Sequence, residues 1–226
     1  MGWLIVGGFL IMTGFALLGY LGKRFSHIFS LIKESGTTEI PGPFDNSSCV
    51  KAIADKTRVV YSSINGARYV SRDKTIYLSY PQGSKNLWAL LEAVHEAGHA
   101  SCPHFLVELL ASSKLRKTFS LIVPATLSFF TGWLFQDYGF SVSLLFLLMA
   151  VPTLAVVAIS HDEIKISNFS RVWLSSYLKN CGLEKYIALI EIMVRAEKIF
   201  MVLDGFALFL IFAGANISLW AMGGLL

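Results

Sequence analysis

The sequence has little charge. Only 15% of its 226 residues are Asp, Glu, Lys or Arg, whereas 54% are hydrophobic, and soluble domains are usually about a quarter charged. The charges are missing in blocks, which are 1–22, 118–160 apart from Asp137, and 199–226 apart from Asp204. This pattern argues against a water-soluble protein, because about 20 consecutive apolar residues are what a helix needs to cross a bilayer.

The charge-poor blocks predict an integral membrane protein with about four transmembrane helices. We expect these spans at roughly 2–22, 118–136, 140–160 and 200–224. The first span has no basic residue before it, and Lys23 and Arg24 follow it. A secretory signal peptide has the reverse arrangement, so this span is expected to be an uncleaved anchor.

Basic residues are absent from both ends of the chain. All 19 Lys and Arg lie in two segments, 23–117 and 161–198, and four spans put both segments on the same side. By the positive-inside rule that side is the cytoplasm. This distribution accounts for the net charge of +4 without a nucleic-acid partner. We expect a multi-pass protein of the bacterial inner membrane, with the lipid bilayer as its partner.

Cysteine is scarce as well. The three cysteines are Cys49, Cys102 and Cys181, all in the predicted cytoplasmic segments. Their odd number and wide spacing argue against a disulfide framework.

The first loop is predicted to contain a small sheet and a helix. Residues 58–79 have the pattern of an antiparallel sheet, with a hairpin turn at Asn65-Gly66. A helix is expected from about 85 to 102, with Ser84 as its N-terminal cap. The second loop, 161–198, is expected to be helical.

One segment of the first loop has the spacing of a metal site. His95-Glu96-Ala97-Gly98-His99 lies within the expected helix. Histidines four positions apart leave one face of a helix and can hold one ion, for which Zn²⁺ is the expected metal. Glu96 points beside the metal, where it can take a proton from an activated water. Gly98 costs about 1 kcal/mol in a helix interior, so we expect a neighbour or the substrate to approach closely there.

A catalytic zinc takes three protein ligands and keeps one position open. Glu163 is the expected third ligand, because it lies about one turn beyond the third span, close to the membrane surface. Ser167 lies four residues further along the same helix face and can orient a ligand histidine through its other ring nitrogen. The alternative for Glu163 is an ordinary ion pair with Lys165 or Arg171.

Several other residues compete for the third ligand position. These competitors are His161, Asp162, Cys102, His104 and Glu92. A closed site of His95, His99 and Cys102 would be structural rather than catalytic, and it would leave Glu96 without a role. Glu92 is better placed as an outer partner or a solvated acid than as a ligand.

The arrangement of motifs resembles a known family. His95-Glu96-Ala97-Gly98-His99-Ala100 follows the strand 75–79, and a transmembrane hairpin precedes Glu163-Ile164-Lys165-Ile166-Ser167. This resembles the YugP-type neutral zinc metallopeptidase family and, more distantly, HtpX-like and prenyl-protein-processing membrane proteases. The resemblance implies a gluzincin-like HExxH enzyme with a zincin-like α+β cytoplasmic domain. Its ligands would be His95, His99 and Glu163, and Glu96 would be the base. The family has Asp where this chain has Lys165.

We therefore expect a mainly α membrane metallopeptidase, formed as a single domain over 1–226 with catalytic loops 23–117 and 161–198. It would hydrolyse peptide bonds of membrane or unfolded proteins, in quality control or processing. The substrate is expected to add to an edge strand at 75–79. A donor for the oxyanion is also needed, and the candidates are His161, which is also a candidate outer partner of the metal ligands, Asn168 and Arg171.

Two other functions are compatible with the sequence. A non-catalytic membrane protein can use a metal site for assembly or regulation, although Glu96 then has no role. A small transporter is suggested by Asp204 and Asn216 in the fourth span, because such residues in a membrane are costly and often functional.

Overall fold

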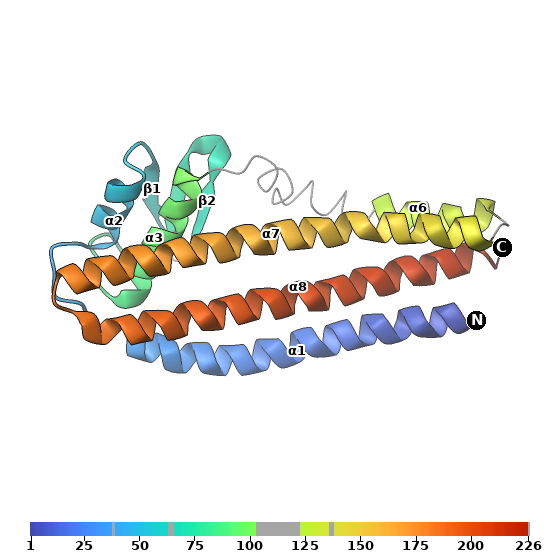
Figure 1. Ribbon diagram of the computed structural model, residues 1–226, viewed down its shortest axis with the longest axis horizontal. Helices are drawn as coiled ribbons and strands as arrows, with labels where there is room; N and C mark the ends of the chain where they lie inside the picture. The colour runs from blue at the N-terminus through green and yellow to red at the C-terminus, as the bar shows by residue number, and fades with distance from the viewer. Residues whose placement is uncertain (38, 63–65, 103–122, 136–137, 226) are drawn as a thin grey trace. The chain divides into compact units, whose positions relative to one another are not determined.

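The structure, a computed structural model, describes the backbone of residues 1–37, 39–62, 66–102, 123–135 and 138–225. Within these ranges, the side chains of residues 25, 26, 28, 29, 31–36, 138, 139, 151, 152, 155 and 156 are not described. The protein is mainly helical with one small sheet (Figure 1), which confirms that part of the predicted fold class. The helices are α1 (Gly2–Gly36), α2 (Asn46–Ile53), α3 (Leu87–Ser101), α6 (Val123–Leu134), α7 (Tyr138–Asn180) and α8 (Ile187–Gly223).

The chain divides into two compact units. Unit 1 comprises Met1–Phe25, Phe105–Asp162 and Phe200–Leu226, and unit 2 comprises Ser26–His104 and Glu163–Ile199. The chain therefore passes between the units after residues 25, 104, 162 and 199. The predicted spans and loops meet after residues 22, 117, 160 and 198. Three of these positions lie within about three residues of a boundary between the units, and the position after 117 lies 13 residues from one.

Within unit 1, α1 and α8 pack through glycine. A Cβ atom on Gly7 would lie 2.7 Å from the carbonyl oxygen of Gly214, and one on Gly214 would lie 2.5 Å from that of Gly7. Gly14 makes a similar approach to Ala207 at 2.8 Å, whereas the adjacent Gly8 has nothing within 4 Å. Small residues that let helix backbones approach this closely are typical of helices that associate in lipid.

Polar side chains in unit 1 form hydrogen bonds between its helices. Ser128 of α6 donates to Oδ1 of Asn216 in α8 at 2.7 Å, and Nδ2 of Asn216 donates to the carbonyl of Phe212. Nε1 of Trp220 donates to Oγ of Ser141 in α7 at 2.6 Å. Asn216 is 2% exposed, so its amide is satisfied by the packing of α6 against α8.

Two helices in the described parts of the chain are long and apolar enough to cross a membrane. These are Gly2–Arg24 and Glu184–Gly223. The predicted span 118–136 begins outside the described residues, and its described part is the 12-residue α6. The predicted span 140–160 lies in α7, where Phe140–Ala150 is a shorter apolar segment.

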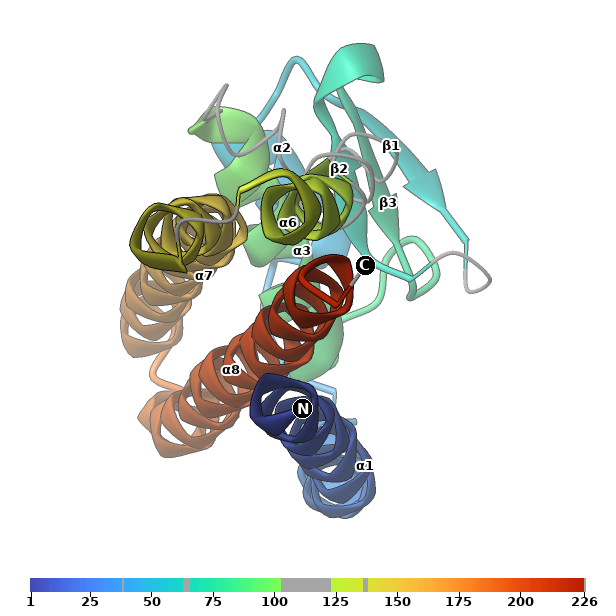
Figure 2. The same ribbon diagram turned by 90° about the vertical axis from the view of Figure 1, so that its right-hand side faces the viewer.

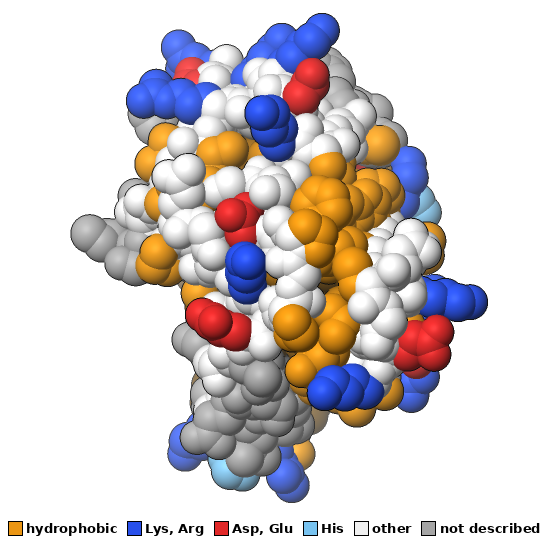
Figure 3. Space-filling model, turned by 90° about the vertical axis from the view of Figure 1, so that its left-hand side faces the viewer, with side chains coloured by type: hydrophobic (Ala, Val, Ile, Leu, Met, Phe, Trp, Pro, Cys, Tyr) orange, Lys and Arg blue, Asp and Glu red, His pale blue; other side chains and the backbone are white. Residues whose placement is uncertain are grey.

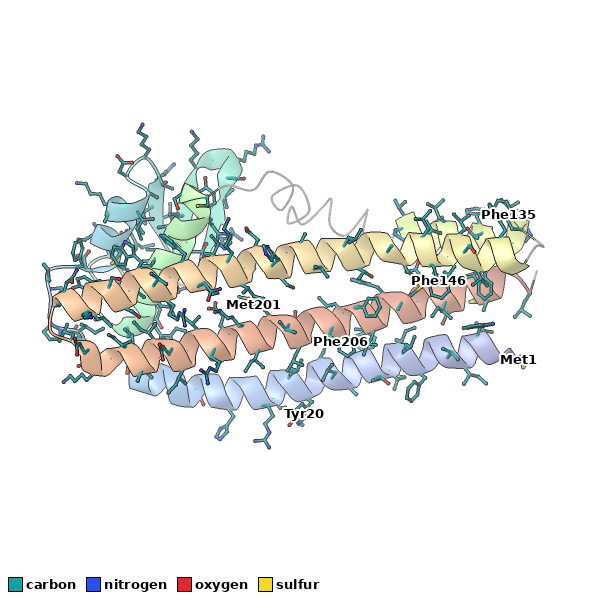
Figure 4. The ribbon with its side chains drawn as sticks, in the orientation of Figure 1. Met1, Tyr20, Phe135, Phe146, Met201 and Phe206 are labelled. Atoms are coloured by element: carbon teal, nitrogen blue, oxygen red, sulfur yellow. The ribbon has the colours of Figure 1, made fainter. Side chains whose placement is uncertain are left out.

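Large apolar side chains are exposed along these helices. Tyr20 on α1 is 58% exposed, Phe146 on α7 is 65% exposed and Phe206 on α8 is 52% exposed (Figure 4). Large apolar side chains exposed on several helices are typical of a surface that meets a membrane or another protein.

The sheet belongs to unit 2 and has three strands, in the order β1-β3-β2 (Figure 2). They are β1 (Arg58–Tyr61), β2 (Arg68–Val70) and β3 (Thr75–Leu78). β1 pairs parallel with β3, and β2 pairs antiparallel with it. Thr75, Ile76 and Leu78 are buried, whereas β1 and β2 are only half-buried. The most buried strand, β3, is therefore the central strand of the sheet.

This topology corrects three predictions. The sheet is mixed rather than antiparallel, and β1 and β2 do not pair as a hairpin, because they lie on opposite sides of β3. Asn65 of the predicted turn lies outside the described residues. Segment 75–79 is central rather than an edge, so the predicted substrate edge was wrong. A turn signal shows where a chain reverses direction, but burial decides which strand lies beside which.

Helix α3 packs on β2 and β3. Its N-terminal cap is Asn86, whose side chain accepts a hydrogen bond from the Ala89 amide at 2.8 Å. The predicted cap, Ser84, instead donates to the carbonyl of Pro81, so that prediction was wrong. Asn serves as well as Ser at this position.

The second loop is helical, as predicted. α7 continues from unit 1 to Asn180, and a short 3₁₀ turn, Glu184–Tyr186, leads into α8. Leu174 and Leu178 of α7, together with Ile190 and Met193 of α8, are fully buried in the core that also contains β3 and α3. Both helices are therefore fixed against the helix that carries the histidine motif.

Candidate metal centre

His95 and His99 are held on one face of α3 by the core beneath that helix. Leu90, Val94 and Ala97 have no exposed surface, and they fix the helix against the sheet and its neighbours. Because the histidines are four positions apart, their side chains meet on one face. The two Nε2 atoms lie 3.2 Å apart, and His95 is 9% exposed.

Glu163 comes to this pair from α7. Its Oε2 atom lies 3.2 Å from Nε2 of His95 and 3.4 Å from Nε2 of His99. Among the described residues, these three side chains form the group whose ligand atoms are close enough to hold one metal ion. The structure thus brings together the three residues that were predicted as ligands, and all three belong to unit 2.

The three ligand atoms have the spacing of a zinc site. They form a nearly equilateral triangle with sides of 3.2, 3.2 and 3.4 Å. In a tetrahedral site with bonds near 2.0–2.1 Å, ligand atoms are separated by roughly 3.3–3.4 Å. Two imidazoles and one carboxylate are also a known donor set for catalytic zinc. The residues present therefore fit zinc in both chemistry and size.

His95 and Glu163 each favour the charged form of the other. Burial alone would lower the pKa of His95, but the hydrogen bond to Glu163 and the charges of Glu197, Glu96 and Glu163 raise it to about 9. Burial would raise the pKa of Glu163, but its hydrogen bonds and charge interactions with His95 and His99 lower it to about 2. Without a metal, the site is therefore an imidazolium–carboxylate pair at neutral pH.

Glu96 is buried next to this group, with 8% of its surface exposed. Burial raises the pKa of its carboxyl group to about 7, and the charges of both histidines partly oppose that shift. The charges of Glu163 and Glu92 raise it further. A carboxyl group that titrates near neutrality can both accept and donate a proton under physiological conditions.

Gly98 allows α7 to approach α3 next to the ligands. A Cβ atom at this position would lie 3.1 Å from Cγ2 of Ile166 and 3.1 Å from Cδ1 of Phe169. Ile166 lies three residues after Glu163, so this contact helps to set the distance between the carboxylate and the histidines. The close approach expected at Gly98 is thus made by side chains of α7.

Glu92 ties α3 to the sheet. Its Oε1 atom accepts a hydrogen bond from the backbone amide of Ser79, directly after β3. Glu92 does not belong to the group of three ligands, and the charge of its carboxylate contributes to the raised pKa of Glu96.

Ser167 does not hydrogen-bond a ligand histidine. Its hydroxyl group is fully buried and donates to Oε2 of Glu197 in α8 at 3.2 Å. Glu197 was not among the predicted site residues. A signal for it exists in the sequence, because Ile190, Met193, Val194 and Glu197 follow the i, i+3, i+4, i+7 spacing of one helix face.

The other predicted candidates lie outside the group of three ligands. His161 is exposed, and a two-residue offset on a helix turns it about 200° away from Glu163. Asp162 is 5% exposed and does not belong to the group either. Asn168 accepts a hydrogen bond from Nζ of Lys198, and Arg171 is exposed.

The closed histidine–cysteine site is not formed. Cys102 is the exposed C-terminal cap of α3, and it is not part of the group that includes His95 and His99. His104 lies outside the described residues.

Comparison with known proteins adds no relative from which a function can be transferred. No family model, no curated protein and no solved structure matches the chain. A function for this protein therefore has to rest on the geometry of His95, His99, Glu163 and Glu96.

Proposed function

We propose that this protein is a membrane-bound, zinc-dependent endopeptidase of the YugP-like, gluzincin type. The triangle formed by His95 Nε2, His99 Nε2 and Glu163 Oε2, with sides of 3.2–3.4 Å, carries this proposal. These residues would hold zinc. When bound, zinc supplies Lewis acidity that polarises a carbonyl and brings the pKa of water toward about 7.

Glu96 performs the proton transfers in this proposal. It accepts a proton from the attacking water and later delivers that proton to the leaving amine. Its buried position keeps the carboxylate away from bulk solvent, and its pKa of about 7 suits both roles. A positive charge at the triangle favours the carboxylate, which is the form that starts the reaction.

The substrate is a polypeptide in an extended conformation. With β3 in the centre of the sheet, β1 and β2 are the edges. β2 is the edge strand that packs against α3, and no described strand pairs with its outer side. We therefore place the substrate along Arg68–Val70, where backbone hydrogen bonds can hold a peptide of varied sequence.

The membrane topology belongs to the same proposal. α1 and α8 supply two spans, and the α6–α7 hairpin supplies two more. Exposed apolar side chains and close glycine packing in unit 1 support this arrangement. Basic side chains are spread over the face shown in Figure 3, whereas α1 carries no Lys or Arg before Lys23. Unit 2 accordingly lies in the cytoplasm, at the bacterial inner membrane.

No observation favours the alternative functions. Asn216, one of the two residues that suggested a transporter, is buried and hydrogen-bonded to Ser128. A purely structural metal site would not need the buried Glu96.

The test compares wild-type protein with Glu96→Gln in detergent, because Gln keeps the shape of the side chain and removes the proton-carrying group. We expect about one zinc per chain in both proteins and cleavage of an unfolded polypeptide by the wild type alone. The proposal would be refuted if the wild-type protein contained no zinc and could not be loaded with it. Equal cleavage by both proteins would also refute it.

A further inference from the structure

A second carboxylate, Glu197 of α8, lies beside the ligand group without belonging to it. Ser167, fully buried and one helical turn after Glu163, donates its hydroxyl proton to Oε2 of Glu197 at 3.2 Å. This hydrogen bond fixes the carboxylate next to the face of α7 that carries the ligand.

Glu197 lies on an otherwise apolar stripe of α8. Ile190, Met193 and Val194 on this stripe are at most 1% exposed, and Glu197 follows them at the next helical repeat. Glu191, about 120° around the helix from Glu197, is exposed. Placing a carboxylate against a core is unfavourable unless a partner compensates, and one serine hydroxyl occupies only one of its acceptor sites.

His95 offers a second partner for this half-buried carboxylate. Its Nδ1 atom is buried and has no hydrogen-bond partner in the described structure. Glu163 of α7 contacts Nε2 of the same ring, and Ser167, one turn further along α7, holds Glu197. The Glu197 carboxylate is therefore held one helical turn from the residue that contacts His95. When Nε2 is a metal ligand, the proton resides on Nδ1, and that N–H needs an acceptor that fixes the ring.

We propose that Glu197, held by Ser167, is a positioning residue that fixes the His95 imidazole for metal binding, by accepting the Nδ1–H hydrogen bond directly or through one water. The proposal rests on the metal site of the proposed function. In this proposal, three helices contribute residues to the metal centre. α3 supplies the histidines, α7 supplies Glu163 and Ser167, and α8 supplies the acid that orients His95.

Other acids near the site are already engaged. Glu92 accepts the amide of Ser79, Glu163 contacts Nε2 of both histidines, and Glu96 directly follows His95 on α3, so its side chain leaves the helix about 100° away from that of His95. Glu197 is thus the charged group best placed to serve Nδ1.

The experiment measures zinc affinity by chelator competition and thermal stability of the metal-free protein, for wild type, Glu197→Leu, Glu197→Gln and the exposed control Glu191→Leu. We expect Glu197→Leu to weaken zinc binding about 10–100-fold, which is usual for loss of such a partner. Its metal-free stability should fall only modestly, because Leu extends the apolar stripe but leaves the buried Ser167 hydroxyl without its acceptor. Gln retains an acceptor oxygen, so its loss should be smaller, and Glu191→Leu should bind as the wild type does.

A spectroscopic measurement separates positioning from a general structural effect. In zinc-loaded protein with ¹⁵N-labelled histidine, the Nδ1–H proton of His95 should be protected from exchange in the wild type and in Glu191→Leu, and exchange rapidly in Glu197→Leu. Unchanged zinc affinity in Glu197→Leu, with affinity lost in Glu163→Ala, would overturn this inference and leave the proposed function standing. A wild type that binds no zinc would overturn both.

Discussion

Oε2 of Glu163 lies 3.2 Å from Nε2 of His95, although 68 positions separate the two residues in the sequence. The histidine lies on a helix of the first loop, and the acid lies on α7. Contacts on both sides of this pair hold the helices together: Gly98 against Ile166 and Phe169, and a shared hydrophobic core. This one distance turns a two-histidine motif into a candidate three-ligand site.

Removing Glu163 should abolish tight zinc binding. We expect Glu163→Ala to weaken zinc affinity by more than about 100-fold, because loss of an outer partner alone costs about 10–100-fold. His161→Ala is the matched control on the same helix and should bind zinc as the wild type does, since its side chain is exposed. Chelator competition measures both. Equal loss in the two variants would contradict the assignment of Glu163.

Zinc binding should release a proton at neutral pH. The hydrogen bond to Glu163 and nearby carboxylate charges outweigh burial and raise the pKa of His95 to about 9, so the metal must displace a proton from this ring. Apparent affinity should rise about tenfold per pH unit up to about pH 9, and then level off. Calorimetry in buffers of different ionisation enthalpy counts the released protons. Affinity that stays constant between pH 7 and 9 would argue against a protonated His95.

Gly98→Ala should impair the site more than the fold. The new Cβ atom would lie 3.1 Å from side-chain atoms of Ile166 and Phe169. These side chains have to give by a few tenths of an ångström, and we expect part of that strain to displace Glu163 on the same helix. A better helix residue offsets part of the strain, by about 1 kcal/mol. We expect zinc affinity and proteolysis to fall about tenfold, because small displacements of reacting groups are costly. Adding Phe169→Leu should restore part of both, and full activity in Gly98→Ala alone would show that the contact is unimportant.

Gly7 and Gly8, which are neighbours in α1, should respond differently to replacement by leucine. Gly7→Leu forces α1 away from Gly214 and Ser218 of α8, and overpacking of this kind costs about 1–3 kcal/mol. Gly8→Leu meets nothing within 4 Å and should leave stability unchanged. Thermal unfolding in detergent compares the two variants. Similar transition temperatures for both would argue against the glycine contact between α1 and α8.

The proposed topology predicts different accessibility for the two units in intact cells. In a background without the native cysteines, a membrane-impermeant maleimide should label Leu225→Cys but not Asp55→Cys. Both positions are exposed, so permeabilised cells should show labelling of both. Labelling of Asp55→Cys in intact cells would place unit 2 outside and refute the cytoplasmic assignment.

Much of the site follows from local sequence. The spacing of His95 and His99 determines that both rings leave one face of α3, because a helix repeats every 3.6 residues. The charge-poor blocks likewise indicate which parts of the chain are apolar, and all three lie within unit 1 apart from residue 199. These features depend on neighbours along the chain, so they can be predicted without knowing what packs against them.

Other features were decided by tertiary packing. The central position of β3 follows from its burial, which overrode the hairpin signal at Asn65-Gly66. Glu197 meets Ser167 only because α7 and α8 share a core with α3. The spacing of the motif was therefore enough to predict that His95 and His99 share one helix face, with Glu96 beside them. Only the tertiary structure shows that Glu163 lies close to the histidines and that Glu197 is the second acid near them. Contacts between distant segments depend on which surfaces are buried together.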